Sequence, residues 1–118
     1  MKISFIGLGV MGYPMAGHLQ TAGFDVTVYN RTTRKAQDWA KLYGGNYKTT
    51  VSECVQNADV VICCVGNDDD VRSVITASSG AISAMNEGAI LIDHTTTSAN
   101  LAEELLKACQ TAGIAFMD

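Results

Sequence analysis

The chain has 118 residues, of which 47% are hydrophobic, and a formal net charge of −4. This length corresponds to one domain, since domains usually have roughly 100–200 residues. The eight basic residues form no block that would bind nucleic acid, and no stretch approaches the roughly 18 apolar residues of a membrane span. We therefore expect neither a nucleic-acid partner nor a membrane partner, and the first residues do not have the pattern of a secretory signal.

Apolar runs alternate with amphipathic segments along the chain. Residues 2–6 predict a strand, and residues 10–22 predict a helix that ends at Gly23. The later elements are a strand at 25–29, a helix at 32–43, a minor strand at 46–48, a short helix at 50–57, a buried strand at 58–65, a helix opening at 68–70, a turn with Ile82 and Met85, a buried strand at 89–92, a helix capped by Ser98 and ended by Gly113, and a strand at 114–117. This alternation predicts an α/β fold of the Rossmann type, with one doubly wound parallel sheet in a single domain.

A glycine motif follows the first strand. Gly7, Gly9 and Gly12 have the spacing Gly-x-Gly-x-x-Gly between an apolar strand and a helical pattern, which is the setting where the motif indicates a dinucleotide site. We expect Gly7 to form the tight turn, Gly9 to let a pyrophosphate approach the backbone, and Gly12 to let the helix pack closely on the strand. The helix N-terminus then offers free N–H groups and a partial positive charge to phosphates.

The end of the second strand favours NADP over NAD, although NAD stays possible. Sites for NAD usually have Asp or Glu at this position to bind the ribose 2′-hydroxyl, whereas this chain has Asn30, Arg31 and Thr32. Asn30 carries no charge to repel a 2′-phosphate, Arg31 can pair with that phosphate, and Thr32 can donate a hydroxyl. Arg34 and Lys35 add positive charge nearby. The alternative is a solvated helix start with ordinary surface bases.

The exits of the later strands carry polar residues as well. Val65 and Gly66 lie where a cofactor would cross the edge of the sheet, and Gly66 permits close backbone approach. The aspartates at 68–70 suit a helix N-terminus, so we expect no metal site there. His94 and the hydroxyls at 95–98 follow a strand, but they are typical of turns and caps. We therefore assign no catalytic residue, neither His94 nor His18 in the first helix.

The four cysteines lack the spacing of a metal site or a disulfide framework. They are Cys54, Cys63, Cys64 and Cys109. The adjacent Cys63 and Cys64 lie in an apolar run and are expected to be small buried side chains. This usage indicates a reducing, cytoplasmic compartment.

The chain resembles the N-terminal NAD(P)-binding domain of the β-hydroxyacid dehydrogenases, a family that includes 3-hydroxyisobutyrate dehydrogenase, tartronate semialdehyde reductase, glyoxylate/succinic semialdehyde reductases and, more distantly, 6-phosphogluconate dehydrogenase. The resemblance covers nearly the whole chain and rests on FIGLGVMGYPMAGHL, VYNRT, ADVVICCVGNDDDV, LIDHTTTSA and FMD. It implies cofactor contacts at Gly7, Leu8, Gly9, Val10, Met11, Gly12, Asn30, Arg31, Thr32, Val65, Gly66, Asp70, Val71 and Thr96. Val65-Gly66 departs from the Leu-Pro that is frequent in the family.

The resemblance also implies a function. It predicts an NADP-linked oxidoreductase that transfers hydride between the nicotinamide and a small 3-hydroxyacid or semialdehyde. The family's Gly-rich substrate loop, catalytic lysine and helical second domain follow the segment that matches this chain, and Lys107 does not correspond to that lysine. We therefore expect residues 1–118 to bind cofactor without turnover, and the full-length protein to be a homo-oligomer. The alternative is a stand-alone dinucleotide-binding module with a regulatory or interaction role.

Overall fold

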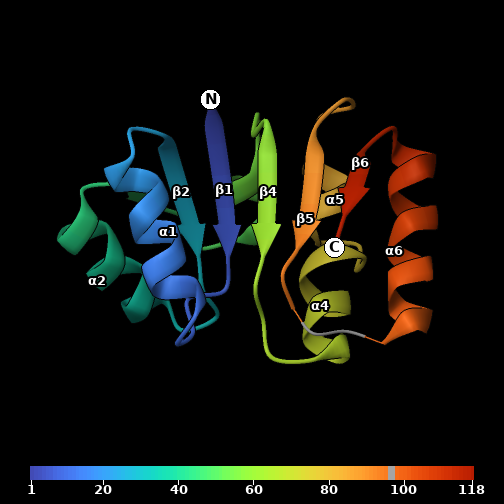
Figure 1. Ribbon diagram of the computed structural model, residues 1–118, viewed down its shortest axis with the longest axis horizontal. Coiled ribbons are helices and arrows are strands. Elements are labelled where there is room, and N and C mark those ends of the chain that lie inside the picture. Colours follow the sequence, from blue (N-terminus) through green and yellow to red (C-terminus); the bar gives the residue numbers. More distant parts are fainter. Residues whose placement is uncertain (96–97) are drawn as a thin grey trace.

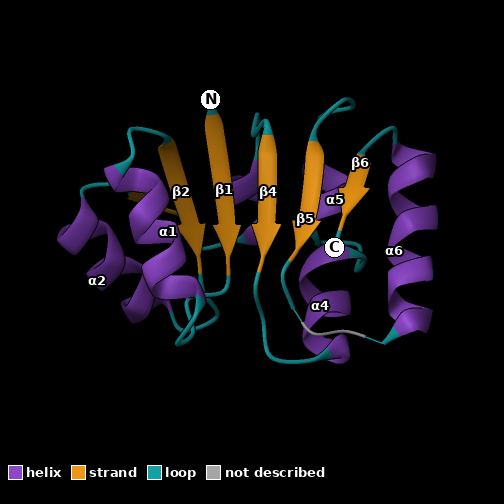
Figure 2. Ribbon diagram, in the orientation of Figure 1, coloured by secondary structure: helices purple, strands orange, loops and turns teal. Residues whose placement is uncertain are grey.

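The computed structural model describes residues 1–95 and 98–118, and within these residues six parallel strands form one sheet (Figures 1 and 2). The strands are β1 (Lys2–Ile6), β2 (Asp25–Tyr29), β3 (Asn46–Tyr47), β4 (Val60–Cys63), β5 (Ile90–Asp93) and β6 (Ala115–Met117). The helices are α1 (Gly12–Thr21), α2 (Thr33–Tyr43), α3 (Val51–Val55), α4 (Asp68–Ile75), α5 (Ala81–Ala84) and α6 (Ala99–Ala112). The strand order is β3-β2-β1-β4-β5-β6, so the predicted doubly wound Rossmann-type sheet is confirmed.

Several predicted elements are shorter in the structure. The strand predicted at 58–65 pairs with β1 only from Val60 to Cys63, because β1 itself ends at Ile6. The helix predicted at 50–57 is α3, and it ends where Asn57 adopts a left-handed backbone conformation with φ of 60°. The first helix begins at Gly12 rather than at residue 10, which leaves Val10 in the turn before it. The early end of β4 and the late start of α1 lengthen the loops at the carboxyl edge of the sheet, whereas the early end of α3 lengthens the loop that leads into β4.

Two apolar cores lie on opposite faces of the sheet. Successive residues of a strand point to opposite faces, so Phe5 of β1 packs in one core and Ile6 in the other. One core contains the buried residues of α1 and α2, including Trp39, whose indole N–H donates to the Tyr13 carbonyl oxygen at 3.3 Å. The other core contains the buried residues of α3 to α6, including Leu101 and Leu105. Burial on both faces explains the nearly continuous apolar sequence of the central strands.

The turn from β1 into α1 is packed against its neighbours through the backbone. Gly7 has φ of +101°, and a Cβ there would collide with the carbonyl oxygen of Cys64, just after β4. A Cβ on Gly12 would collide with the carbonyl oxygen of Gly7. The Gly7 N–H donates to the Tyr29 carbonyl oxygen at 2.9 Å, which ties the turn to the end of β2. The turn is therefore fixed between β2 and β4.

The cysteines behave as small buried side chains, with one exception. All four are free, and Cys54, Cys63 and Cys109 are buried. Burial raises the pKa of Cys54 to about 12 and that of Cys109 to about 11, so these thiols stay protonated at neutral pH. The expectation of burial is wrong for Cys64, which is only half-buried because it follows the last residue of β4 and faces a pocket. None of the described helices has the length and apolar character to cross a membrane.

Candidate functional site

A pocket of about 940 Å³ lies at the carboxyl ends of β1, β2 and β4. Ligand pockets typically have about 300–1,000 Å³, so this pocket is large enough for a cofactor. The chain proceeds from β1 outward to β3 on one side and from β4 outward to β6 on the other. The pocket therefore lies where the direction of strand succession reverses, which is where ligands bind in open α/β sheets.

Most of the residues expected to contact cofactor line this pocket. They are Gly7, Leu8, Gly9, Val10, Met11, Gly12, Asn30, Arg31, Thr32, Val65, Gly66 and Asp70. Val71 is fully buried in the core beneath α4, so its side chain supports the helix rather than the pocket wall. Thr96 lies outside the described residues. His18 and His94 are exposed, and neither is among the described residues that line the pocket.

One wall of the pocket was missed by the sequence analysis. It comes from Thr49 and Thr50 before α3, from Val51 and Ser52 at the start of α3, and from Ser73, Val74 and Ser79 in and after α4. In the sequence, the hydroxyl residues at 49–52 indicate a helix cap. Thr50 has this role, since its Oγ1 accepts the Glu53 N–H at 3.2 Å. Only the position of β3 beside β2 brings this segment to the pocket.

The glycine turn leaves space for an anion. A Cβ on Gly9 would meet nothing within 4 Å, and Gly9 lines the pocket. Side chains cap the N-termini of α3, α4 and α6, whereas α1, like α2 and α5, has no side-chain cap within the described chain. The Tyr13 N–H already donates to the Gly9 carbonyl oxygen at 3.0 Å and Pro14 has no N–H, so a ligand would meet the N–H groups of the turn and of Gly12, where the helix adds a partial positive charge. These features fit a dinucleotide pyrophosphate.

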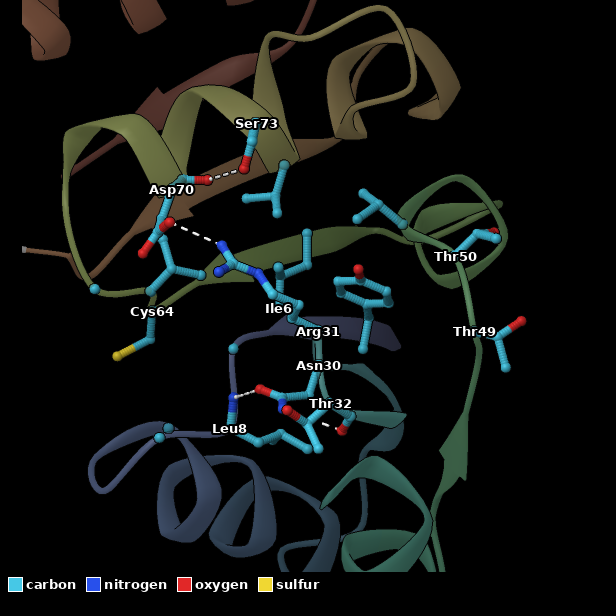
Figure 3. Close-up of a pocket in the computed structure, with 18 of the residues that line it drawn as sticks. Ile6, Leu8, Asn30, Arg31, Thr32, Thr49, Thr50, Cys64, Asp70 and Ser73 are labelled. Carbon is cyan, nitrogen blue, oxygen red and sulfur yellow. Dashed lines mark hydrogen bonds and ion pairs between the residues drawn. The ribbon is translucent and has the colours of Figure 1, made fainter. Parts of the chain in front are cut away.

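Asn30 joins the end of β2 to the glycine turn. Its Oδ1 accepts the Leu8 N–H at 2.9 Å, and its Nδ2 donates to the Thr32 carbonyl oxygen at 3.2 Å (Figure 3). The role predicted for Asn30 from the sequence is the absence of a carboxylate charge at this position. The structure adds a second role, since the amide holds the backbone that faces the pocket.

Arg31 extends from the end of β2 across the pocket. Its Nη2 donates to Oδ1 of Asp70 on α4 at 2.8 Å, and its side chain is 76% exposed (Figure 3). Arg34 instead pairs along its own helix with Asp38 at 3.2 Å. Arg31 is therefore the member of this basic group whose guanidinium lines the pocket.

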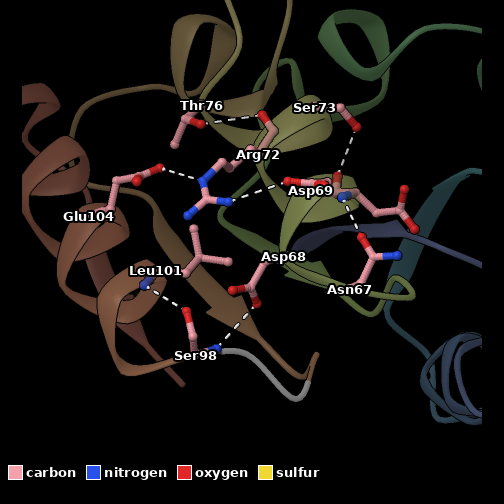
Figure 4. A network of polar contacts seen from close by, with 10 residues as sticks. Asn67, Asp68, Asp69, Arg72, Ser73, Thr76, Ser98, Leu101 and Glu104 are labelled. Atoms are coloured by element: carbon pink, nitrogen blue, oxygen red, sulfur yellow. Dashed lines mark hydrogen bonds and ion pairs between the residues drawn. The ribbon is translucent and has the colours of Figure 1, made fainter.

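The three consecutive aspartates of α4 have different partners (Figure 4). Asp68 accepts the Ser98 N–H at 3.2 Å, and hydrogen bonds from Ser98 lower the pKa of Asp68. Asp69 pairs with Arg72 at 3.4 Å, and Arg72 also contacts Glu104 at 3.2 Å. Asp70 is paired with Arg31 in the pocket. Within residues 1–95 and 98–118, no three carboxylate, thiol or imidazole groups lie together as a metal site.

A polar network at the end of β5 fixes the loop after β4. Asp93 is 4% exposed, and its Oδ1 accepts the Thr95 N–H at 2.9 Å. Thr95 Oγ1 in turn accepts the Val65 N–H at 2.9 Å. Thr95, which the sequence pattern indicates only as a turn residue, therefore positions Val65 at the pocket. Oδ2 of Asp93 has no hydrogen-bond partner among the described residues, and burial raises the pKa of this carboxyl group.

We expect Asp93→Asn to flatten the pH dependence of stability. Because burial raises the Asp93 pKa above its ordinary value of 3.8, the neutral carboxyl stabilises the fold fully below pH 3.8, and this contribution is lost as pH rises through the higher folded pKa. The variant stays neutral, so its free energy of unfolding should rise relative to that of wild type between pH 3.5 and pH 7. Urea unfolding at both pH values measures this change, with the exposed Asp25→Asn as control. An equal difference at both pH values would contradict it.

These features together define a dinucleotide-binding domain of the Rossmann type. They are the strand order, the glycine turn where the direction of strand succession reverses, and the uncapped helix that faces the pocket. The chain belongs to the family described as the NAD binding domain of 6-phosphogluconate dehydrogenase, which matches residues 2–118. The predicted family and fold are thereby confirmed.

Known proteins of this family are oxidoreductases. The chain is 52% identical over 117 residues to an uncharacterized oxidoreductase of Shewanella frigidimarina, covering 99% of this chain and 40% of that protein. It is 45% identical over 108 residues to the mitochondrial 3-hydroxyisobutyrate dehydrogenase-like 1 protein of Arabidopsis thaliana, covering 91% of this chain and 32% of that protein. The chain thus spans well under half the length of these relatives.

Solved structures share the fold. The chain is similar to the 3-hydroxyisobutyrate dehydrogenase of Mycobacterium tuberculosis with L-serine, with a TM-score of 0.87 and 29% identity over 98% of this chain and 38% of that one. It is also similar to the imine reductase from Myxococcus stipitatus in complex with NADP+, with a TM-score of 0.87 and 26% identity over 98% of this chain and 39% of that one.

Proposed function

We propose that the pocket binds NADP(H) in preference to NAD(H). The observation that carries this proposal is the exposed guanidinium of Arg31 at the pocket, beside Asn30 where an NAD site has a carboxylate. A guanidinium matches the geometry of a phosphate and is attracted by its charge. The NADP+ complex of the imine reductase from Myxococcus stipitatus supports the same cofactor for a related fold.

The described residues fit the two halves of such a cofactor. The N–H groups of the glycine turn, up to Gly12 at the start of α1, would hold the pyrophosphate, and Arg31 with Thr32 would hold the 2′-phosphate. Val65, whose N–H is held by the Thr95 hydroxyl, and Gly66 would border the part nearer the nicotinamide. The bound nicotinamide supplies a hydride donor or acceptor, and this chain supplies its binding and orientation.

We propose further that the chain is the cofactor-binding domain of an oxidoreductase for a small 3-hydroxyacid or semialdehyde. The 3-hydroxyisobutyrate dehydrogenase-like relative from Arabidopsis thaliana and the dehydrogenase from Mycobacterium tuberculosis support this substrate class. Binding without turnover by residues 1–118 and homo-oligomerisation of the full-length protein stay predictions. A cytoplasmic location also stays a prediction, and the four free cysteines support it.

Replacing Arg31 with Ala tests the cofactor preference. We expect the variant to lose about 1–3 kcal/mol of affinity for NADPH and much less for NADH, since only NADPH carries the 2′-phosphate that pairs with the guanidinium. Fluorescence titration with each nucleotide measures both affinities. Arg34→Ala is the matched control, because Arg34 is also exposed but pairs with Asp38 on its own helix. Equal losses for both nucleotides, or tighter binding of NADH by wild type, would refute the preference.

A further inference from the structure

The ion pair between Arg31 and Asp70 connects two loops that border the candidate cofactor pocket. Arg31 follows β2 and Asp70 lies in the first turn of α4, so 39 positions separate them in the sequence. Both residues line the pocket, and their side chains are 76% and 30% exposed (Figure 3). Asp70 is therefore bound to the same Arg31 guanidinium to which we assign binding of the 2′-phosphate.

The structure fixes Asp70 more firmly than Arg31. The Asp70 N–H donates to Oδ1 of Asn67 at 2.9 Å, and the Asp70 carbonyl oxygen accepts the Ser73 hydroxyl at 2.9 Å. Asp70 is thus held by a capped helix turn, whereas Arg31 is a long, exposed side chain in the segment between β2 and α2. The carboxylate is the fixed partner, and the guanidinium is the partner that can move.

The neighbouring aspartates show that this placement is specific to Asp70. Asp68 is directed to the backbone of Ser98, and Asp69 to the side chain of Arg72 (Figure 4). A general requirement for negative charge at a helix N-terminus would be met by these two residues. It does not explain why the third carboxylate pairs with an arginine across the pocket.

We propose that Asp70 is a specificity-determining residue that competes with the 2′-phosphate of NADP(H) for Arg31. Asp70 engages the guanidinium through Nη2, so a phosphate that binds the guanidinium fork through the same Nη2 would weaken or break the Arg31–Asp70 pair. NAD(H) has no 2′-phosphate and leaves the pair intact. Asp70 therefore lowers the affinity for NADP(H) but not that for NAD(H). It thereby reduces the difference between the two affinities that Arg31 creates. This inference rests on the proposed function.

The test is the neutral variant Asp70→Asn, titrated with NADPH and with NADH by fluorescence. NADPH should bind about two- to fivefold more tightly than to wild type, which is the range expected when an exposed ion pair no longer competes. The affinity for NADH should change by less than the affinity for NADPH. Asp69→Asn is the matched control, since it removes the same charge from the adjacent position. The Asp69 side chain is 96% exposed and pairs with Arg72 instead of Arg31.

A double-variant cycle shows whether Asp70 acts through Arg31. In an Arg31→Ala background, Asp70→Asn should give no gain in NADPH affinity, because there is no guanidinium left to release. A gain of the same size in that background, or an equal gain from Asp69→Asn, would overturn the inference in favour of general charge repulsion. Asp70→Ala, which also removes the carboxylate and is well tolerated inside a helix, tests the same competition if Asp70→Asn does not fold.

The outcomes separate this inference from the function on which it rests. If wild type binds neither nucleotide, or if Arg31→Ala weakens NADPH and NADH equally, the proposed function fails and the inference fails with it. If Arg31→Ala weakens NADPH selectively but Asp70→Asn leaves NADPH affinity unchanged, the function stands and only the competition by Asp70 is refuted.

Discussion

Replacing Gly9 with Val is expected to abolish binding of NADPH and NADH while the fold survives. A Cβ at Gly9 would meet no protein atom within 4 Å, and the residue lines the pocket, so the new side chain would enter the space where a pyrophosphate approaches the backbone. Fluorescence titration measures the loss of binding, and circular dichroism during thermal unfolding measures the retained fold. A variant that binds NADPH at wild-type affinity would show that this turn is not the site.

Gly12→Val serves as the opposite control within the same motif. A Cβ at Gly12 would collide with the carbonyl oxygen of Gly7 and lie 3.1 Å from the Phe5 ring, so the clash is with the protein itself. We expect this variant to lose about 1–3 kcal/mol of stability or more, as in other overpacked interiors. Gly9 is thus required for ligand binding, whereas Gly12 is required for the packing of the fold.

Replacing Asn30 with Ala should weaken NADPH and NADH by similar factors. Asn30 Oδ1 accepts the Leu8 N–H, and without it this part-buried donor in the glycine turn loses its partner. Leaving such a group unsatisfied costs about 1–3 kcal/mol, and the turn that faces the pyrophosphate loosens. The pyrophosphate is common to both nucleotides, so titrations with NADPH and with NADH should show parallel losses, unlike those of Arg31→Ala.

Asn30→Asp is the informative partner of that variant. Its carboxylate keeps an acceptor for the Leu8 N–H and adds a negative charge at the end of β2. We expect it to retain NADH binding and to weaken NADPH binding, because a carboxylate at this position repels a 2′-phosphate and can bind a ribose hydroxyl. If Asn30→Ala weakens the binding of NADPH but not that of NADH, Asn30 acts on the 2′-phosphate. Its hydrogen bond to Leu8 then does not matter for affinity.

Much of the fold could be predicted from the sequence because the signals are local. Apolar runs bounded by glycine, and helices ended by Gly44 and Gly113 in left-handed conformations, give the correct order of elements. The ends of the strand at 58–65 could not be predicted in this way. Its apolar sequence continues past Cys63, but the pairing stops with β1 at Ile6.

The candidate site also has a part that the sequence predicts and a part that only the tertiary structure shows. The sequence by itself determined the glycine turn and the residues at the end of β2, because each glycine and each charge acts where it stands in the chain. Only the tertiary structure decided the partners: Asn30 with Leu8, Arg31 with Asp70, and Thr95 with Val65, which are 22, 39 and 30 positions apart. It also placed Val71 in the core and the segment at 49–52 in the pocket wall. The physical reason is that a parallel sheet collects the carboxyl ends of its strands at one edge, and the order of the strands decides which loops meet there.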